Sequence, residues 1–151
     1  MFSQLFPSKD ATLYSFYPDA NMGLDSIIEV GTPITSDGSN GVFRFLTAFD
    51  QDQISDIINN KILGAQWQSN LRCFIADISA LTIDTTIEVY PISQSWNMGT
   101  GRFADSPEVQ NGVSWIWRDY QGGTPWTTSS FAPDSTGSYS SSVDPGGATW
   151  Y

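Results

Sequence analysis

Residues 41–49 read Gly-Val-Phe-Arg-Phe-Leu-Thr-Ala-Phe, a run rich in the aromatic and apolar side chains that β-strands favour. Successive side chains of a strand point to opposite faces, so Val42 and Phe43 begin two opposite faces, and we expect Arg44 to point outward. Similar short runs occupy residues 11–16, 26–30, 68–78 and 85–90. Short apolar runs separated by turn clusters are typical of a β-sandwich or barrel rather than of alternating strands and helices.

The run at residues 85–90 shows which faces such strands present. Ile87 and Val89 alternate with Thr86, Glu88 and Tyr90, so one face is apolar and the other is half polar. This pattern indicates strands that contact a core on one side only.

One segment has helical spacing instead. Residues 53–63 place Ile54, Ile57, Ile58 and Ile62 at helical intervals and are followed by Gly64, which would suit a helix C-cap. We expect one short helix that crosses the sandwich.

The composition changes after Pro91. Five of the six tryptophans lie beyond it, and a Ser/Thr/Gly/Pro-rich stretch runs from residue 127 to 147. Such a region favours ordered loops held by tryptophan over long strands. We therefore expect an N-terminal docking segment at residues 1–10, a β-sandwich domain at 11–126, and a tail or incomplete final strands at 127–151.

The charge narrows the choice of partners. The chain has 16 acidic and 6 basic residues, a formal net charge of −10, and no basic cluster, so a phosphate backbone would be repelled. No run approaches the roughly 18 apolar residues of a membrane-spanning helix, and the N-terminus lacks the pattern of a secretory signal. We expect a protein made in the cytosol that remains soluble and has neither nucleic acid nor membrane as a partner.

Catalysis has few candidate groups. The sequence contains no histidine, which excludes Ser-His-Asp and Cys-His sites and zinc sites that use histidine. The single cysteine, Cys73, lies in the apolar segment 71–75 and is interpreted as a small buried hydrophobic residue. We predict no enzyme activity, no cofactor and no metal.

Carboxylate pairs are the remaining alternative for catalysis or calcium binding. The candidates are Asp50, Asp52 and Asp56 near the expected helix start, together with Asp105 and Glu108. Acidic residues before a helix favour its N-terminal end, and Asp before Ser-Pro favours a turn. Both groups are interpreted as structural.

The tryptophans admit two interpretations, because an exposed indole can stack on a sugar whereas a buried indole fills a core. Residues 113–117 alternate so that Val113, Trp115 and Trp117 share one face, as in a half-buried strand. We predict that Trp96, Trp115 and Trp117 pack in the core. Tyr120 and Trp126 are the candidates for stacking on a glycan.

Several segments together resemble the DNRLRE-type β-sandwich domains, a broad group that includes alginate-associated carbohydrate-binding modules. The segments occur in the same order as in that group. They are residues 10–14, the loop 17–23, residues 27–30, residues 44–50, residues 87–99 and residues 112–115. The resemblance implies a jelly-roll-like antiparallel β-sandwich in the all-β class, with one short helix and tryptophan-rich loops.

The opening residues 6–14 most resemble versions of this domain in virion structural proteins of tailed phages. The resemblance implies a non-catalytic virion component, such as a tail, fibre, collar or capsid-surface part. Its partners would be other virion proteins and further copies of itself, and its location would be the virion.

The apolar N-terminal residues are candidates for docking, although they could equally close the bottom of the sandwich: Met1, Phe2, Leu5 and Phe6. The alternative function is a carbohydrate-binding module that recognises a bacterial surface polysaccharide through Tyr120 and Trp126.

Overall fold

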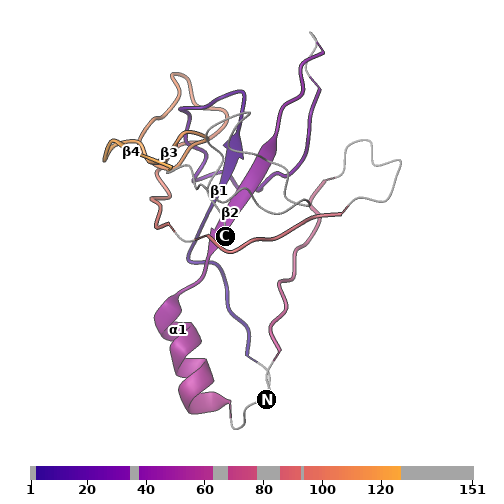
Figure 1. The fold of residues 1–151 in the computed structure, drawn as a ribbon, viewed down its shortest axis with the longest axis vertical. Coiled ribbons are helices and arrows are strands. Elements are labelled where there is room, and N and C mark those ends of the chain that lie inside the picture. The colour runs from indigo at the N-terminus through magenta and orange to yellow at the C-terminus, as the bar shows by residue number, and fades with distance from the viewer. Residues whose placement is uncertain (1–2, 35–37, 63–67, 78–85, 93, 127–151) are drawn as a thin grey trace.

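The computed structural model of the chain describes residues 3–34, 38–62, 68–77, 86–92 and 94–126. In chain order its elements are β1 (Lys9–Tyr14), β2 (Phe43–Ala48), α1 (Gln51–Asp56), the π-helix η1 (Ile57–Lys61), β3 (Trp117–Asp119) and β4 (Thr124–Pro125). β1 and β2 form one two-stranded sheet, β3 and β4 form another, and α1 extends away from the end of β2 (Figure 1). These small antiparallel sheets agree with an all-β class, and the jelly-roll arrangement stays a prediction.

The central sheet forms where two of the apolar runs meet. β1 and β2 are antiparallel, with Lys9 opposite Ala48 and Tyr14 opposite Phe43. On the other edge of β2, Gly31 forms an isolated antiparallel bridge with Phe43, the residue that lies opposite Tyr14. The strands predicted within residues 11–16 and 41–49 are confirmed.

Alternation along these strands gives the sheet two covered faces. On one face, Ala11, Leu13 and Leu46 pack with Trp96, Val113, Trp115 and Trp126 into the larger core. On the other face, Tyr14 packs with Ala20, Met22 and Phe43 into a smaller core. A two-stranded sheet is marginal in water by itself, so the loops that supply these side chains hold it in place.

The prediction that Arg44 points outward is wrong. Arg44 has the same parity as the buried Leu46, and its guanidinium carbon lies 5.0 Å from the centroid of the Trp115 ring. A guanidinium can cover an aromatic face by a cation–π contact while its stem packs against apolar neighbours. This contact explains how a charged residue fits on the core side of β2.

Three predicted strands are not formed among the described residues, namely 26–30, 68–77 and 86–90. A strand needs a partner for its backbone groups. Residues 26–30 contact β1 through a side chain of that strand and not through its backbone. Glu29 N–H donates to Thr12 Oγ1 at 3.0 Å. Farther along the chain, Val113 N–H donates to Asn97 and Ile116 N–H donates to Pro18, on two separate loops, and a strand begins only at Trp117.

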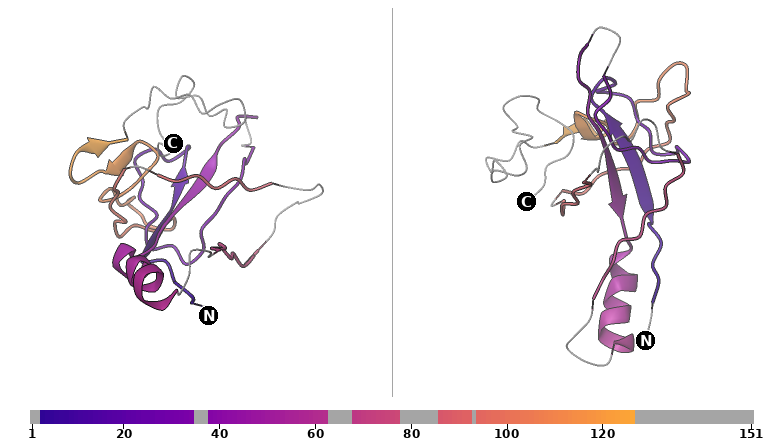
Figure 2. Two further views of the ribbon diagram at one scale, coloured as in Figure 1. Left: turned by 60° about the horizontal axis from the view of Figure 1, so that its bottom comes forward. Right: turned by 90° about the vertical axis from the view of Figure 1, so that its right-hand side faces the viewer.

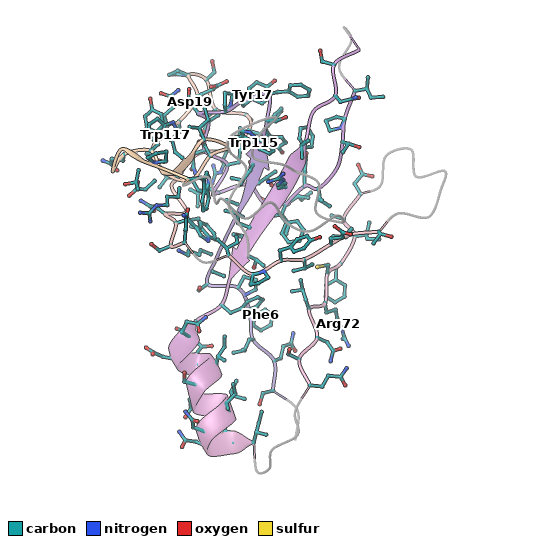
Figure 3. All side chains as sticks on the ribbon, viewed as in Figure 1. Phe6, Tyr17, Asp19, Arg72, Trp115 and Trp117 are labelled. Atoms are coloured by element: carbon teal, nitrogen blue, oxygen red, sulfur yellow. The ribbon has the colours of Figure 1, made fainter. Side chains whose placement is uncertain are left out.

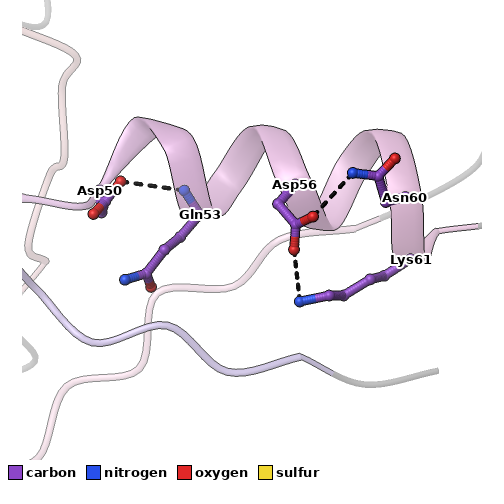
Figure 4. Close-up of polar contacts among 5 residues, drawn as sticks. All are labelled: Asp50, Gln53, Asp56, Asn60 and Lys61. Carbon is purple, nitrogen blue, oxygen red and sulfur yellow. Dashed lines mark hydrogen bonds and ion pairs between the residues drawn. The ribbon is translucent and has the colours of Figure 1, made fainter.

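Asp50 caps the N-terminus of α1. Asp50 Oδ1 accepts hydrogen bonds from the N–H groups of Asp52 (2.8 Å) and Gln53 (3.2 Å), which satisfies free donors of the first turn. Farther along, Asp56 pairs with Lys61 at 2.7 Å and accepts a bond from Asn60 (Figure 4).

The predicted helix is confirmed, but its predicted position is wrong. It extends away from the central sheet instead of crossing it (Figures 1 and 2), and none of its residues is fully buried. Its isoleucines reach only partial burial, because the described sheet places no apolar face beside them. Gly64 lies outside the described residues.

Leu13→Ala tests the larger core. Leu13 is fully buried, and truncating such a leucine removes buried methyl groups and leaves a cavity, which costs about 2–5 kcal/mol. We expect the free energy of unfolding in urea to fall by that amount. The control Ile27→Ala, at a side chain that is half exposed, should change it by less than about 1 kcal/mol. Equal losses in the two variants would contradict this core assignment.

Candidate functional site

Three loops meet at the buried side chain of Asn21. Its Nδ2 donates to the carbonyl oxygens of Met98 (2.7 Å) and Val113 (2.8 Å). Its Oδ1 accepts from the N–H groups of Gly101 (2.7 Å) and Gly23 (3.3 Å). A side-chain amide has two N–H donors and an oxygen with two lone pairs, so every group is used. We call Asn21 and these four partners the Asn21 hub.

Glycine is required around the hub because the backbones approach closely. A Cβ on Gly112 would lie 2.4 Å from the Cα of Gly99, and one on Gly101 would lie 2.2 Å from the carbonyl oxygen of Asn21. Gly99 also has a φ of +75°, a conformation that side chains with a Cβ rarely adopt. The glycines of these loops therefore follow from the packing around one amide.

Next to the hub, residues 24–25 and 101–105 are joined into what we call the paired loops. Leu24 N–H donates to the Gly101 carbonyl at 2.9 Å, and Arg102 Nε donates to the Leu24 carbonyl at 3.2 Å. Phe103 N–H donates to the two carboxylate oxygens of Asp25 at 3.1 and 3.2 Å. These bonds hold the chain from Gly101 to Phe103 against residues 24–25.

Phe103 of the paired loops belongs to an aromatic cluster with Tyr14, Tyr17 and Phe43. The ring centroids lie 4.4 Å apart for Tyr14 and Phe43, 5.4 Å for Tyr14 and Phe103, and 5.7 Å for Tyr17 and Phe103. Tyr14 is buried, whereas Tyr17 and Phe103 remain 39% and 55% exposed. The cluster thus extends from the smaller core to the surface.

Two carboxylates, those of Glu29 and Asp25, affect the ionisation of Tyr14. Burial raises the pKa of Tyr14, and a hydrogen bond to Glu29 together with the negative charges of Glu29 and Asp25 raises this pKa further. Each effect favours the neutral phenol over the phenolate. The aromatic cluster therefore borders an acidic region.

A second feature is an open hollow of about 320 Å³ beside β3, lined by Ser95, Trp96, Asn97, Arg118, Asp119 and Thr124. Arg118 Nη1 donates to the carbonyl oxygen and to Oγ of Ser95, at 3.0 and 3.2 Å. The rings of Trp117 and Tyr120 meet edge to face at 5.4 Å on the same hairpin. Sugar sites combine polar side chains with aromatic rings; here the polar side chains line the hollow, and the rings of Trp117 and Tyr120 lie on the same hairpin but outside the lining.

Of the two residues predicted to stack on a glycan, Trp126 cannot do so. Trp126 is only 6% exposed, and its Nε1 donates to the Ser114 carbonyl at 3.0 Å. Its indole face belongs to the larger core and cannot stack on a ligand. Tyr120 is half-buried against Trp117, and its predicted role stays a prediction.

The other tryptophan predictions have mixed outcomes. Trp96 and Trp115 are buried in the larger core, as predicted. Trp117 is half-buried, and its Nε1 donates to Asp19 at 2.7 Å, where the two side chains lie side by side (Figure 3). Lys9 covers the Trp96 ring, with Nζ 4.3 Å from the ring centroid, and burial lowers the pKa of Lys9.

The predicted docking segment is described only in part. Met1 and Phe2 lie outside the described residues, Leu5 is half-buried, and Phe6 is 74% exposed. Phe6 lies on the segment that leads into β1, far from the labelled Tyr17 (Figure 3). The docking role of these residues stays a prediction.

The buried position predicted for Cys73 is wrong, because Cys73 is exposed. The surrounding residues 68–77 are exposed as well, since the segment does not pair as a strand with described residues. Two of the carboxylates have structural roles. Asp50 caps the helix, and Asp105 forms a turn in which Oδ2 accepts from Arg102 N–H at 2.8 Å.

In the described part of the chain, no group of three or more Cys, Asp or Glu side chains could hold a metal ion. Within the same residues, no helix is long and apolar enough to cross a membrane.

The sequence placed Asn21 in the loop 17–23 of the resemblance but gave neither Asn21 nor Phe103 a structural role. The available signal was the recurrence of glycine in Gly99-Thr100-Gly101 and at Gly112, because clustered loop glycines indicate close backbone approach. Nothing local to Asn21 reveals partners that lie 77 to 92 positions away.

Comparisons with known protein families, with curated proteins and with solved structures found no match for this chain. The resemblance to the DNRLRE-type domains therefore stays a prediction.

Asn21→Ala tests the hub. The variant leaves buried N–H and carbonyl groups without a partner, and each such group costs about 1–3 kcal/mol. We expect the free energy of unfolding to fall by at least about 2 kcal/mol. Asn111→Ala is the control, since the Asn111 side chain makes two hydrogen bonds, both with Thr100 and both exposed, in place of the four buried-loop bonds of Asn21. Its loss should stay near 1 kcal/mol, and a similar loss for both variants would refute the hub.

Tyr14→Phe tests the acidic surroundings of the aromatic cluster. The folded chain raises the pKa of Tyr14, so the unfolded chain ionises first as pH rises. Stability from this group is full below a pH of about 10, the ordinary tyrosine pKa, and is lost above it. We expect the decline of unfolding free energy at alkaline pH to be shallower in Tyr14→Phe than in the native chain. Tyr120→Phe is the control, and an equal effect of both changes would contradict this assignment.

Proposed function

We propose that the chain is a non-catalytic structural module that acts through contacts with other proteins, as a virion component of a tailed phage. The observation that carries this proposal is the exposure of large apolar side chains on several segments. More than half of each of the following side chains is exposed: Phe6, Ile27, Ile34, Phe74, Ile75, Ile87, Val89 and Phe103. Single exposed apolar residues are ordinary, but neighbouring ones indicate a contact surface.

The neighbouring residues lie on two segments. Phe74 and Ile75 are adjacent, and Ile87 and Val89 lie on the same side of an alternating run. Among the described residues, no strand pairs with either segment. Extended apolar segments of this kind can pair with a neighbouring chain, which supports assembly with other virion proteins or with further copies.

The choice of a virion rests on the resemblance of residues 6–14 to the phage versions of the DNRLRE-type domain, whereas the later segments resemble that broad group as a whole. The location proposed is a tail, fibre, collar or capsid surface. A protein in that position works by holding its place, so it needs stable contacts and a rigid frame. The Asn21 hub provides such a frame for three loops.

A second candidate function is recognition of a bacterial surface polysaccharide. The observation that favours it is the hollow beside β3, with Arg118 and Asp119 in its wall and Tyr120 against Trp117 nearby. Because Trp126 is buried, this candidate now depends on Tyr120 and the polar lining.

Mass spectrometry on density-purified phage particles from cultures that produce the chain tests the proposal. We expect its peptides at a constant ratio to those of known particle proteins across the density peak, because a structural part has a fixed copy number. Peptides that sediment apart from the particles would contradict the virion role. In that case, retention of the chain on immobilised polysaccharide, lost in Tyr120→Ala but kept in Tyr90→Ala, would favour the second candidate.

A further inference from the structure

Phe103 is exposed and yet held in one orientation. Its N–H is bound by the carboxylate of Asp25, and its ring rests against the rings of Tyr14 and Tyr17. A side chain that is already ordered loses little conformational freedom when a partner binds. Rigid exposed aromatics are accordingly the residues that most often contribute strongly to protein interfaces.

The surface around Phe103 is apolar and continuous with the paired loops. Tyr17 is 39% exposed and lies in contact with Phe103, and Leu24 is 38% exposed on the opposite loop of the pair. We call Tyr17, Leu24 and Phe103 the Phe103 surface. The loops that carry it are joined to the Asn21 hub through Gly101, so its shape is fixed before any partner arrives.

The border of this surface is acidic. Asp25 lies under the Phe103 backbone, Glu29 bonds the Tyr14 hydroxyl within the aromatic cluster, and Asp105 lies two residues beyond Phe103. Arg102 is a cation at this border, and its Nε donates to the Leu24 carbonyl. Charges at the rim of an interface select partners of opposite sign and accelerate their encounter.

We propose that the Phe103 surface is a preformed docking surface for a protein partner that offers an apolar pocket bordered by lysine or arginine. A second copy of this chain does not fit, because two chains of net charge −10 would place the same carboxylates near one another. Anionic membranes and nucleic acids are repelled by the same carboxylates. Any contact between copies would use another face.

The proposal names the partner chemistry of one surface and rests on the contact function proposed above. The probe is a synthetic peptide of alternating arginine and leucine, compared with one of alternating glutamate and leucine, and binding is followed by amide chemical shifts of the full chain. We expect the arginine peptide alone to bind, to shift the amides of residues 17, 24–25 and 101–105, and to bind more weakly as salt is added.

Variants separate the apolar and charged parts of the surface. Phe103→Ala should weaken binding about tenfold or more, whereas Phe6→Ala, an exposed phenylalanine on the segment before β1, should leave it unchanged. Asp25→Asn keeps an acceptor for Phe103 N–H but removes a charge, so it should reduce the salt dependence. Because Phe103 is more than half exposed, its truncation should leave the melting temperature nearly unchanged.

Four results would overturn the proposal: no binding of the arginine peptide, equal binding of the glutamate peptide, shifts that map to another surface, or unchanged affinity in Phe103→Ala. The two proposals fail separately. A chain that is recovered from particles can fail to bind the peptide at Phe103, which contradicts only the docking surface. A chain that is absent from particles can still bind the peptide, which contradicts only the virion role.

Discussion

The buried amide of Asn21 is the interaction on which the loops of this protein depend. Each of its four hydrogen bonds is worth only about 1 kcal/mol net, but they join backbone groups from three separate loops. In place of a long strand ladder, the described chain uses one side chain as the common partner of these loops. Gly99, Gly101 and Gly112 leave the space that this arrangement needs.

The central sheet connects the two cores to the surface. One face of β1 and β2 carries the larger core, and the other carries Tyr14 and Phe43. The aromatic cluster starts from these two buried or half-buried rings and ends at the exposed Tyr17 and Phe103. The positions of the exposed rings are therefore set by the packing of the buried rings beneath them.

How much could be predicted from the sequence depended on how local each signal was. β1, β2 and the Asp50 cap follow from alternation or from one residue next to a helix start, and these were predicted. The burial of Trp126 and the inward position of Arg44 were not predicted, because alternation gives the two faces of a strand but not the residues that cover each face. The segment around Cys73 has a strand-like composition, but composition cannot supply the partner that a strand requires. The hub was missed because its bonds are set only by the complete chain.

The long separation between bonded residues also has a consequence for biosynthesis. Asn21 bonds a carbonyl 92 positions later, and Trp117 bonds Asp19 across 98 positions. During translation the N-terminal strands must therefore wait, with their apolar faces uncovered, until the tryptophan-rich part has left the ribosome. Folds dominated by such distant pairings close slowly, and intermediates that expose apolar surface are prone to aggregation. Nascent-chain chaperones thus have a period in which to bind this protein before it closes.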